Sequence, residues 1–163
     1  MTDAERVAAL RTAPLLRDFS DVGVRILALA GQARTVGRGT YAFRAGEPSI
    51  ALSFILKGTV QLLPRDGGGV LGEMTTGDTL GGFSLLLQGQ GGEHLLSVMA
   101  VSDVELLVLT QEKFEALQKA KPRASLKLLL ALAHDLGERM RDAKAPLREF
   151  LVWQVGKRQS ESR

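Results

Sequence analysis

Glycine interrupts the middle of this 163-residue chain too often for a long helix to form there. Between residues 33 and 109, glycines or glycine clusters recur roughly every eight to twelve residues and separate short apolar or alternating runs. A glycine inside a helix costs about 1 kcal/mol relative to alanine, whereas tight turns between strands use it readily. We therefore expect antiparallel strands in a sandwich, roll or barrel, and not alternating strand–helix units.

The clearest predicted strands lie at residues 53–56, 59–63, 95–101 and 105–109. Helices are expected before them. Residues 3–11 have helical spacing behind Thr2 or Asp3 as the N-cap. A second helix carries Val24, Leu27 and Ala28, with Ser20 or Asp21 as its cap and Gly31 at its end.

The chain becomes helical again after Thr110. A short helix begins there, and a long amphipathic helix opens at Pro122. Apolar residues follow one another along the long helix at steps of three and four, which predicts a seam for a partner helix. The seam comprises Leu126, Leu129, Ala133, Leu136, Met140 and Ala143. We expect residues 122–155 to form a homodimerisation helix that is broken near Pro146. Residues 156–163 are expected to form a flexible tail. The alternative to dimerisation is that the long helix packs on the strands of its own chain.

Composition excludes several classes of function. The chain has no cysteine and two histidines, so neither thiol catalysis nor a metal site is expected. Its net charge of +3 names no partner. No apolar run approaches the roughly 18 residues of a spanning helix, and no signal peptide is evident at the N-terminus. We expect a cytoplasmic protein without a membrane partner.

Several spaced motifs resemble those of the cyclic-nucleotide-binding domain family. They are Gly39-Thr40-Tyr41-Ala42-Phe43-Arg44-Ala45-Gly46-Glu47, Phe54-Ile55-Leu56-Lys57-Gly58-Thr59-Val60 and Gly77-Asp78-Thr79-Leu80-Gly81. The resemblance covers roughly residues 10–145. It implies a mainly β fold with flanking helices, in which an antiparallel, jelly-roll-like β-roll at residues 1–121 is followed by a short helix and a long C-terminal helix.

The resemblance also locates a ligand pocket and shows that two of its side chains are changed. In the family, a short helix after a Phe-Gly-Glu motif offers amides to the cyclic phosphate, the glutamate binds the ribose, and an arginine pairs with the phosphate. The matching residues here are Gly81, Gly82, Phe83 and Ser84, with Gly82 at the glutamate position. His94 stands at the arginine position, after a loop that is a few residues longer than usual.

These changes predict a non-enzymatic regulatory or scaffolding module that needs no cofactor and acts on an unidentified protein partner. The alternative is an atypical nucleotide sensor, in which the amides of Gly82, Phe83 and Ser84 hold an anion, Ser97 or His94 assists, and the missing side chain at Gly82 opens space. A cupin enzyme would need clustered metal ligands that the sequence lacks. The sequence also stops before the helix-turn-helix that DNA-reading relatives carry, so no specific DNA binding is expected.

Overall fold

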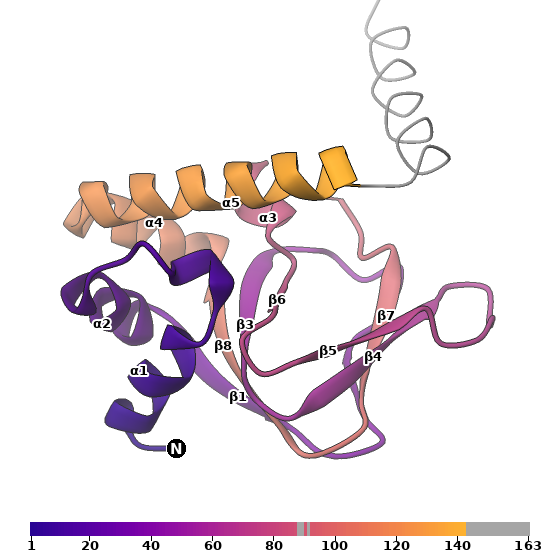
Figure 1. Cartoon of the computed structure of the whole chain (residues 1–163). Coiled ribbons are helices and arrows are strands. Elements are labelled where there is room, and N and C mark those ends of the chain that lie inside the picture. Colours follow the sequence, from indigo (N-terminus) through magenta and orange to yellow (C-terminus); the bar gives the residue numbers. More distant parts are fainter. Residues whose placement is uncertain (88–89, 91, 143–163) are drawn as a thin grey trace, which may run out of the picture. The chain divides into compact units, whose positions relative to one another are not determined.

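The computed structural model describes residues 1–87, 90 and 92–142 (Figure 1). The contacts within the chain group its residues into two compact units, Met1–Leu132 and Ala133–Arg163. The helices are α1 (Asp3–Arg11), η1 (Pro14–Leu16), α2 (Asp21–Ala30), α3 (Phe83–Leu86), α4 (Gln111–Ala120) and α5 (Pro122–Asp142). The strands are β1 (Gln32–Val36), β2 (Tyr41–Phe43), β3 (Ala51–Lys57), β4 (Thr59–Pro64), β5 (Gly72–Thr75), β6 (Thr79–Leu80), β7 (Leu96–Ala100) and β8 (Val104–Thr110).

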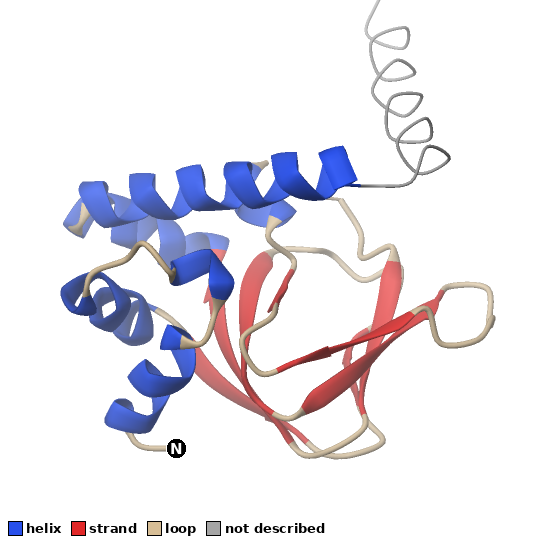
Figure 2. Ribbon diagram, viewed as in Figure 1, coloured by secondary structure: helices blue, strands red, loops and turns tan. Residues whose placement is uncertain are grey.

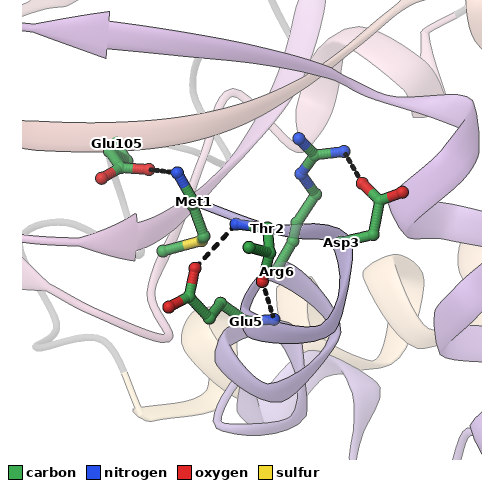
Figure 3. A network of polar contacts seen from close by, with 6 residues as sticks. All are labelled: Met1, Thr2, Asp3, Glu5, Arg6 and Glu105. Carbon is green, nitrogen blue, oxygen red and sulfur yellow. Dashed lines mark hydrogen bonds and ion pairs between the residues drawn. The ribbon is translucent and has the colours of Figure 1, made fainter.

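Local hydrogen bonds explain where the first helix begins. Thr2, not Asp3, is the N-cap of α1: its hydroxyl accepts the Glu5 N–H at 3.2 Å, and the Glu5 carboxylate accepts the Thr2 N–H at 2.7 Å (Figure 3). This reciprocal capping box satisfies two amides that a helix start leaves open. The Met1 amino group lies 3.8 Å from the carboxylate of Glu105 on β8, which ties the start of α1 to the sheet (Figure 3).

The second helix begins and ends at predicted residues, but its last glycine has another reason to be there. Ser20 caps α2 by accepting the Gly23 N–H at 3.2 Å. Gly31 follows α2 with a φ of −79°, which is not the left-handed conformation that a C-terminal glycine often supplies. A Cβ on Gly31 would lie 2.6 Å from Cγ of Leu107. Glycine therefore permits the close approach of the chain to β8.

The strands form two four-stranded antiparallel sheets, in the orders β1-β8-β3-β6 and β2-β7-β4-β5 (Figure 2). The four predicted strands are confirmed as β3, β4, β7 and β8; β3, β4 and β8 are longer than expected, and β7 is shorter. Strands β1, β2, β5 and β6 were not predicted. Each of these four lies at the edge of its sheet, where a short or polar segment is held by one neighbour. The predicted antiparallel β-roll with flanking helices is confirmed.

Strand β3 is buried on both faces and separates two apolar cores. Leu52, Phe54 and Leu56 face the core that the helices cover, while Ile55 faces the interior of the roll. This explains why its sequence is apolar at every buried position except Ser53 and does not alternate with polar residues. The helices α1, α2 and α4 therefore pack on the outer face of one sheet, and a separate apolar core fills the interior of the roll (Figure 2).

The long helix α5 turns a different face inward than the predicted seam assumed. It buries Ser125, Leu128 and Leu132. Leu129, which was assigned to the dimer seam, is half-buried and packs against the helical core. The remaining described seam residues are exposed or half-buried: Leu126, Ala133, Leu136 and Met140. Ala143, the predicted break near Pro146 and the predicted tail lie outside the described residues.

Among the described residues, no helix is both long enough and apolar enough to cross a bilayer.

Candidate functional site

His94, one of the predicted ligand-pocket residues, lies on a segment that backbone hydrogen bonds hold against another part of the chain. Residues 46–49, between β2 and β3, run antiparallel to residues 92–94, before β7. The Gly46 N–H donates to the His94 carbonyl, the His94 N–H donates to the Glu47 carbonyl, and the Ser49 N–H donates to the Gly92 carbonyl, each at 2.8 Å. We call this pairing the clasp. It fixes the backbone of His94, so the position of its ring is determined by the fold.

The His94 ring stacks on an aromatic ring of the roll. Its centroid lies 4.8 Å from that of Phe43 on β2, with 29° between the two planes. Burial lowers the pKa of His94 below its ordinary 6.5, and the nearby Glu47 carboxylate opposes this only in part. The lowered pKa favours the neutral ring at pH 7, so His94 is a poor substitute for the positive charge of the family's arginine.

The start of α3 is shaped by two glycines with different physical roles. Gly81 has a φ of +74°, and a Cβ there would lie 2.3 Å from the Ala51 carbonyl oxygen, so only glycine fits. Gly82 has no such backbone requirement. A Cβ on Gly82 would instead lie 3.0 Å from Cδ2 of Leu132 on α5 and 3.8 Å from Cδ1 of Leu52. The expectation that Gly82 opens space is therefore wrong, because leucine side chains occupy that space.

The serines of the site bond to the protein itself. The hydroxyls of Ser84 on α3 and Ser49 in the clasp lie 2.7 Å apart, and both residues are buried. The Ser84 N–H also donates to the Gly81 carbonyl at 3.0 Å. On β7, the Ser97 hydroxyl accepts the Ala45 N–H at 2.9 Å. Neither the Ser84 amide nor any of these three hydroxyls is left without a partner.

Charged side chains near the site also have partners. The Arg65 guanidinium lies 3.4 Å from the Glu93 carboxylate. Arg44 lies over the Tyr41 ring at 4.0 Å, and Arg34 lies over the Phe43 ring at 5.5 Å. No group of histidine and acidic side chains that could hold a metal ion occurs within the described residues.

The fold brings the predicted residues into one region through residues that sequence reasoning missed. Ser49 bonds to Ser84 through its hydroxyl and to the segment of His94 through its amide. Phe43 stacks on the His94 ring, and Leu132 lies 3.0 Å from where a Cβ on Gly82 would stand. Phe43 lies in one of the motifs that carry the family resemblance, but no pattern in the sequence pairs it with His94. Phe83 begins α3, and residues 88, 89 and 91 of the longer loop lie outside the described residues.

Comparison with known proteins gives consistent matches. The family model for the cyclic nucleotide-binding domain matches residues 33–121. An uncharacterized NTE family protein of Mycobacterium tuberculosis is 30% identical over 152 residues, which are 93% of this chain and 25% of that protein. The chain thus spans about a quarter of the length of the curated relatives it matches.

Two solved structures illustrate the similarity of fold. The catabolite activator protein of Thermus thermophilus superposes with a TM-score of 0.70 at 29% identity, covering 86% of this chain and 63% of that one. A cyclic nucleotide-binding domain from Methylobacillus flagellatus gives a TM-score of 0.71 at 24% identity, covering 86% and 79% of the two chains.

Proposed function

The chain belongs to the cyclic nucleotide-binding domain family, and on that premise we propose that it is a non-enzymatic regulatory or scaffolding module that does not bind cyclic AMP or cyclic GMP in the family's usual way. In this proposal it is cytoplasmic and acts through contacts with another protein. Ser84 supports a non-enzymatic role, because the partner of its hydroxyl is Ser49 and not a histidine that could act as a base.

The observation that carries the proposal is the packing of Leu132 on Gly82. A side chain at this position would place its Cβ 3.0 Å from Cδ2 of Leu132, which is 4% exposed and belongs to the helical core, so Leu132 would have to move by a few tenths of an ångström. His94 supports the proposal independently, since a neutral ring stacked on Phe43 offers neither charge nor a bidentate fork to a phosphate.

The expected loss of affinity is large. A hydrogen bond to a charged group contributes about 1.5–3 kcal/mol. Loss of both the glutamate and the arginine would therefore weaken binding by roughly a hundred- to ten-thousandfold. A micromolar ligand of the family would become a millimolar one here.

Thermal unfolding with added nucleotide tests this proposal. Only a ligand that binds the folded state raises the melting temperature. Cyclic AMP or cyclic GMP at a concentration of tens of micromolar should leave the melting temperature unchanged. A rise of several degrees with either nucleotide would overturn the proposal and favour the atypical sensor. That alternative has less support, because the Ser84 amide and the Ser97 hydroxyl already have partners within the protein.

We also propose that α5 mediates a homodimer. On its outward side, Leu126 is 57% exposed and Met140 is 38% exposed, and both recur on one helix face with Ala133. A second copy would cover this stripe, which contains three residues of the predicted seam.

We further propose that the described end of α5 makes no sequence-specific contact with DNA. Its cations there pair with acids of the same helix, as Arg139 does with Asp135 at 2.8 Å.

A further inference from the structure

Four cations gather where α4 meets α5. Lys119, Lys121, Arg123 and Lys127 are exposed, and residues 116–134 contain no aspartate or glutamate. No ion pair among the described residues involves any of the four. We call these four residues the basic elbow.

The basic elbow is electrostatically unfavourable for the isolated chain. Arg123 stands in the first turn of α5, where the helix dipole already places positive charge, and that turn contains no acid. Lys121 adds like charge just before this turn, whereas Lys119 lies in the last turn of α4, where the helix dipole favours a cation. Arrangements that oppose local stability are expected where a surface serves a partner. A partner with negative charge would relieve this repulsion.

One flank of α5 joins these cations to an exposed apolar side chain. At about 100° per residue, Arg123, Leu130 and Lys127 fall within roughly 60° of one another around the helix. Leu130 is 62% exposed. Lys127 is held in place, because its ammonium group donates to the Asp18 carbonyl and lies 5.1 Å from the centre of the Phe19 ring. The flank therefore presents an apolar side chain at one edge and two cations beside it, of which Lys127 is fixed.

We propose that the basic elbow and Leu130 dock an acidic amphipathic helix of a partner protein, an inference that rests on the proposed role in protein contacts. A leucine of the partner would pack on Leu130, and carboxylates beside it would face the four cations, as in other helix-in-groove recognition. A lipid surface fits less well. Interfacial helices bury a broad apolar face rich in large residues, whereas Leu128 and Leu132 of α5 point into the core and α5 has no aromatic residue.

This docking surface is compatible with a homodimer. Around the helix, Leu126, Ala133 and Met140 of the seam lie on one side of Leu130, and Arg123 and Lys127 lie on the other. A second copy on the seam would leave the basic flank open. The two interactions can therefore be separated by substitution.

A synthetic peptide tests the proposal. The probe is a peptide of about five helical turns with leucine along one face and glutamate beside it, and its lysine-substituted counterpart is the negative control. Binding of the acidic peptide to the full chain is measured by fluorescence anisotropy. Neutralising the elbow with Lys119→Gln, Lys121→Gln and Arg123→Gln should weaken binding about ten- to hundredfold. Leu130→Ser should also weaken it without changing the sedimentation of the protein.

A matched variant controls for net charge. Arg34→Gln, Arg38→Gln and Arg65→Gln remove three cations from the roll, and this variant should bind the peptide like the wild type. Unchanged melting temperatures would establish that each variant folds. Equal peptide affinity of the elbow variant and the wild type would overturn the proposal. Failure of the acidic peptide to bind, together with elbow-dependent flotation on phosphatidylglycerol vesicles, would overturn it in favour of a lipid surface. Neither result depends on nucleotide binding. The proposal that the module does not bind cyclic nucleotides is tested separately, by adding cyclic AMP or cyclic GMP.

Discussion

Substitution of Gly82 by glutamate is predicted to destabilise the protein through a single contact. The Cβ of any side chain at this position lies 3.0 Å from Cδ2 of Leu132, closer than the roughly 3.5–4.0 Å at which carbon atoms attract each other. Overpacking of this kind costs about 1–3 kcal/mol. For a chain of this length, each kcal/mol lowers the melting temperature by about 2–4 °C.

A double-mutant cycle isolates that contact. Leu132→Ala alone should cost about 2–5 kcal/mol, because Leu132 is buried in the helical core. On this background Gly82→Glu should add almost nothing, which gives a coupling free energy of about 1–3 kcal/mol in urea unfolding. The matched control is Gly137→Glu on α5, where a Cβ would have nothing within 4 Å. That variant should be neutral or slightly more stable, since glycine inside a helix costs about 0.5–1 kcal/mol. Additive free energies at positions 82 and 132 would refute the packing explanation.

Three further predictions concern the turn before α3, the stacked histidine and the seam. Gly81→Ala should destabilise the protein much more than Gly39→Ala in chemical unfolding, because both have positive φ (+74° and +78°) but only Gly81 would bring a Cβ against a carbonyl oxygen; equal losses would contradict this. Because the folded state lowers the pKa of His94, its contribution to stability is full above pH of about 6.5 and is lost as the pH falls towards the folded value. Phe43→Ala should raise that pKa in an NMR titration, and an unchanged midpoint would exclude the stack as a cause of the burial. Leu126→Glu should convert a dimer to a monomer in sedimentation velocity, and a wild type that is monomeric at tens of micromolar would remove the dimer proposal.

The sequence predicts the central strands and misses those at the edges for a physical reason. Strand β3 carries its own signal, since burial on both faces requires the apolar run that predicts it. Strand β1 is Gln-Ala-Arg-Thr-Val with four exposed residues, and its own residues give little reason to form a strand. It forms because β8 offers an unpaired edge, with Gln32 opposite Val108 and Val36 opposite Val104. Such pairing is decided by the neighbour and not by local propensity.

The sequence likewise predicts only part of the candidate site. The positions of Gly82 and His94 follow from motif spacing, but the residues that pack against them do not. Helix α5 has leucines at positions 126, 128, 129, 130, 132 and 136, so apolar spacing alone does not decide which face turns inward. The seam assigned from that spacing includes Leu129, which packs against the helical core, and the spacing does not identify Leu132 as a core residue. Contact with Gly82 makes Leu132 important, and that contact joins residues fifty positions apart in the sequence.

Isothermal titration calorimetry of the full chain with cyclic AMP and with cyclic GMP tests the central proposal most directly. A site with glycine at the glutamate position, packed by Leu132, and with His94 at the arginine position should give no saturable heat below millimolar nucleotide. The variant carrying Gly82→Glu and His94→Arg should behave in the same way, because the new glutamate still meets Leu132. A saturable isotherm of the wild type with a micromolar Kd for either nucleotide would contradict the account.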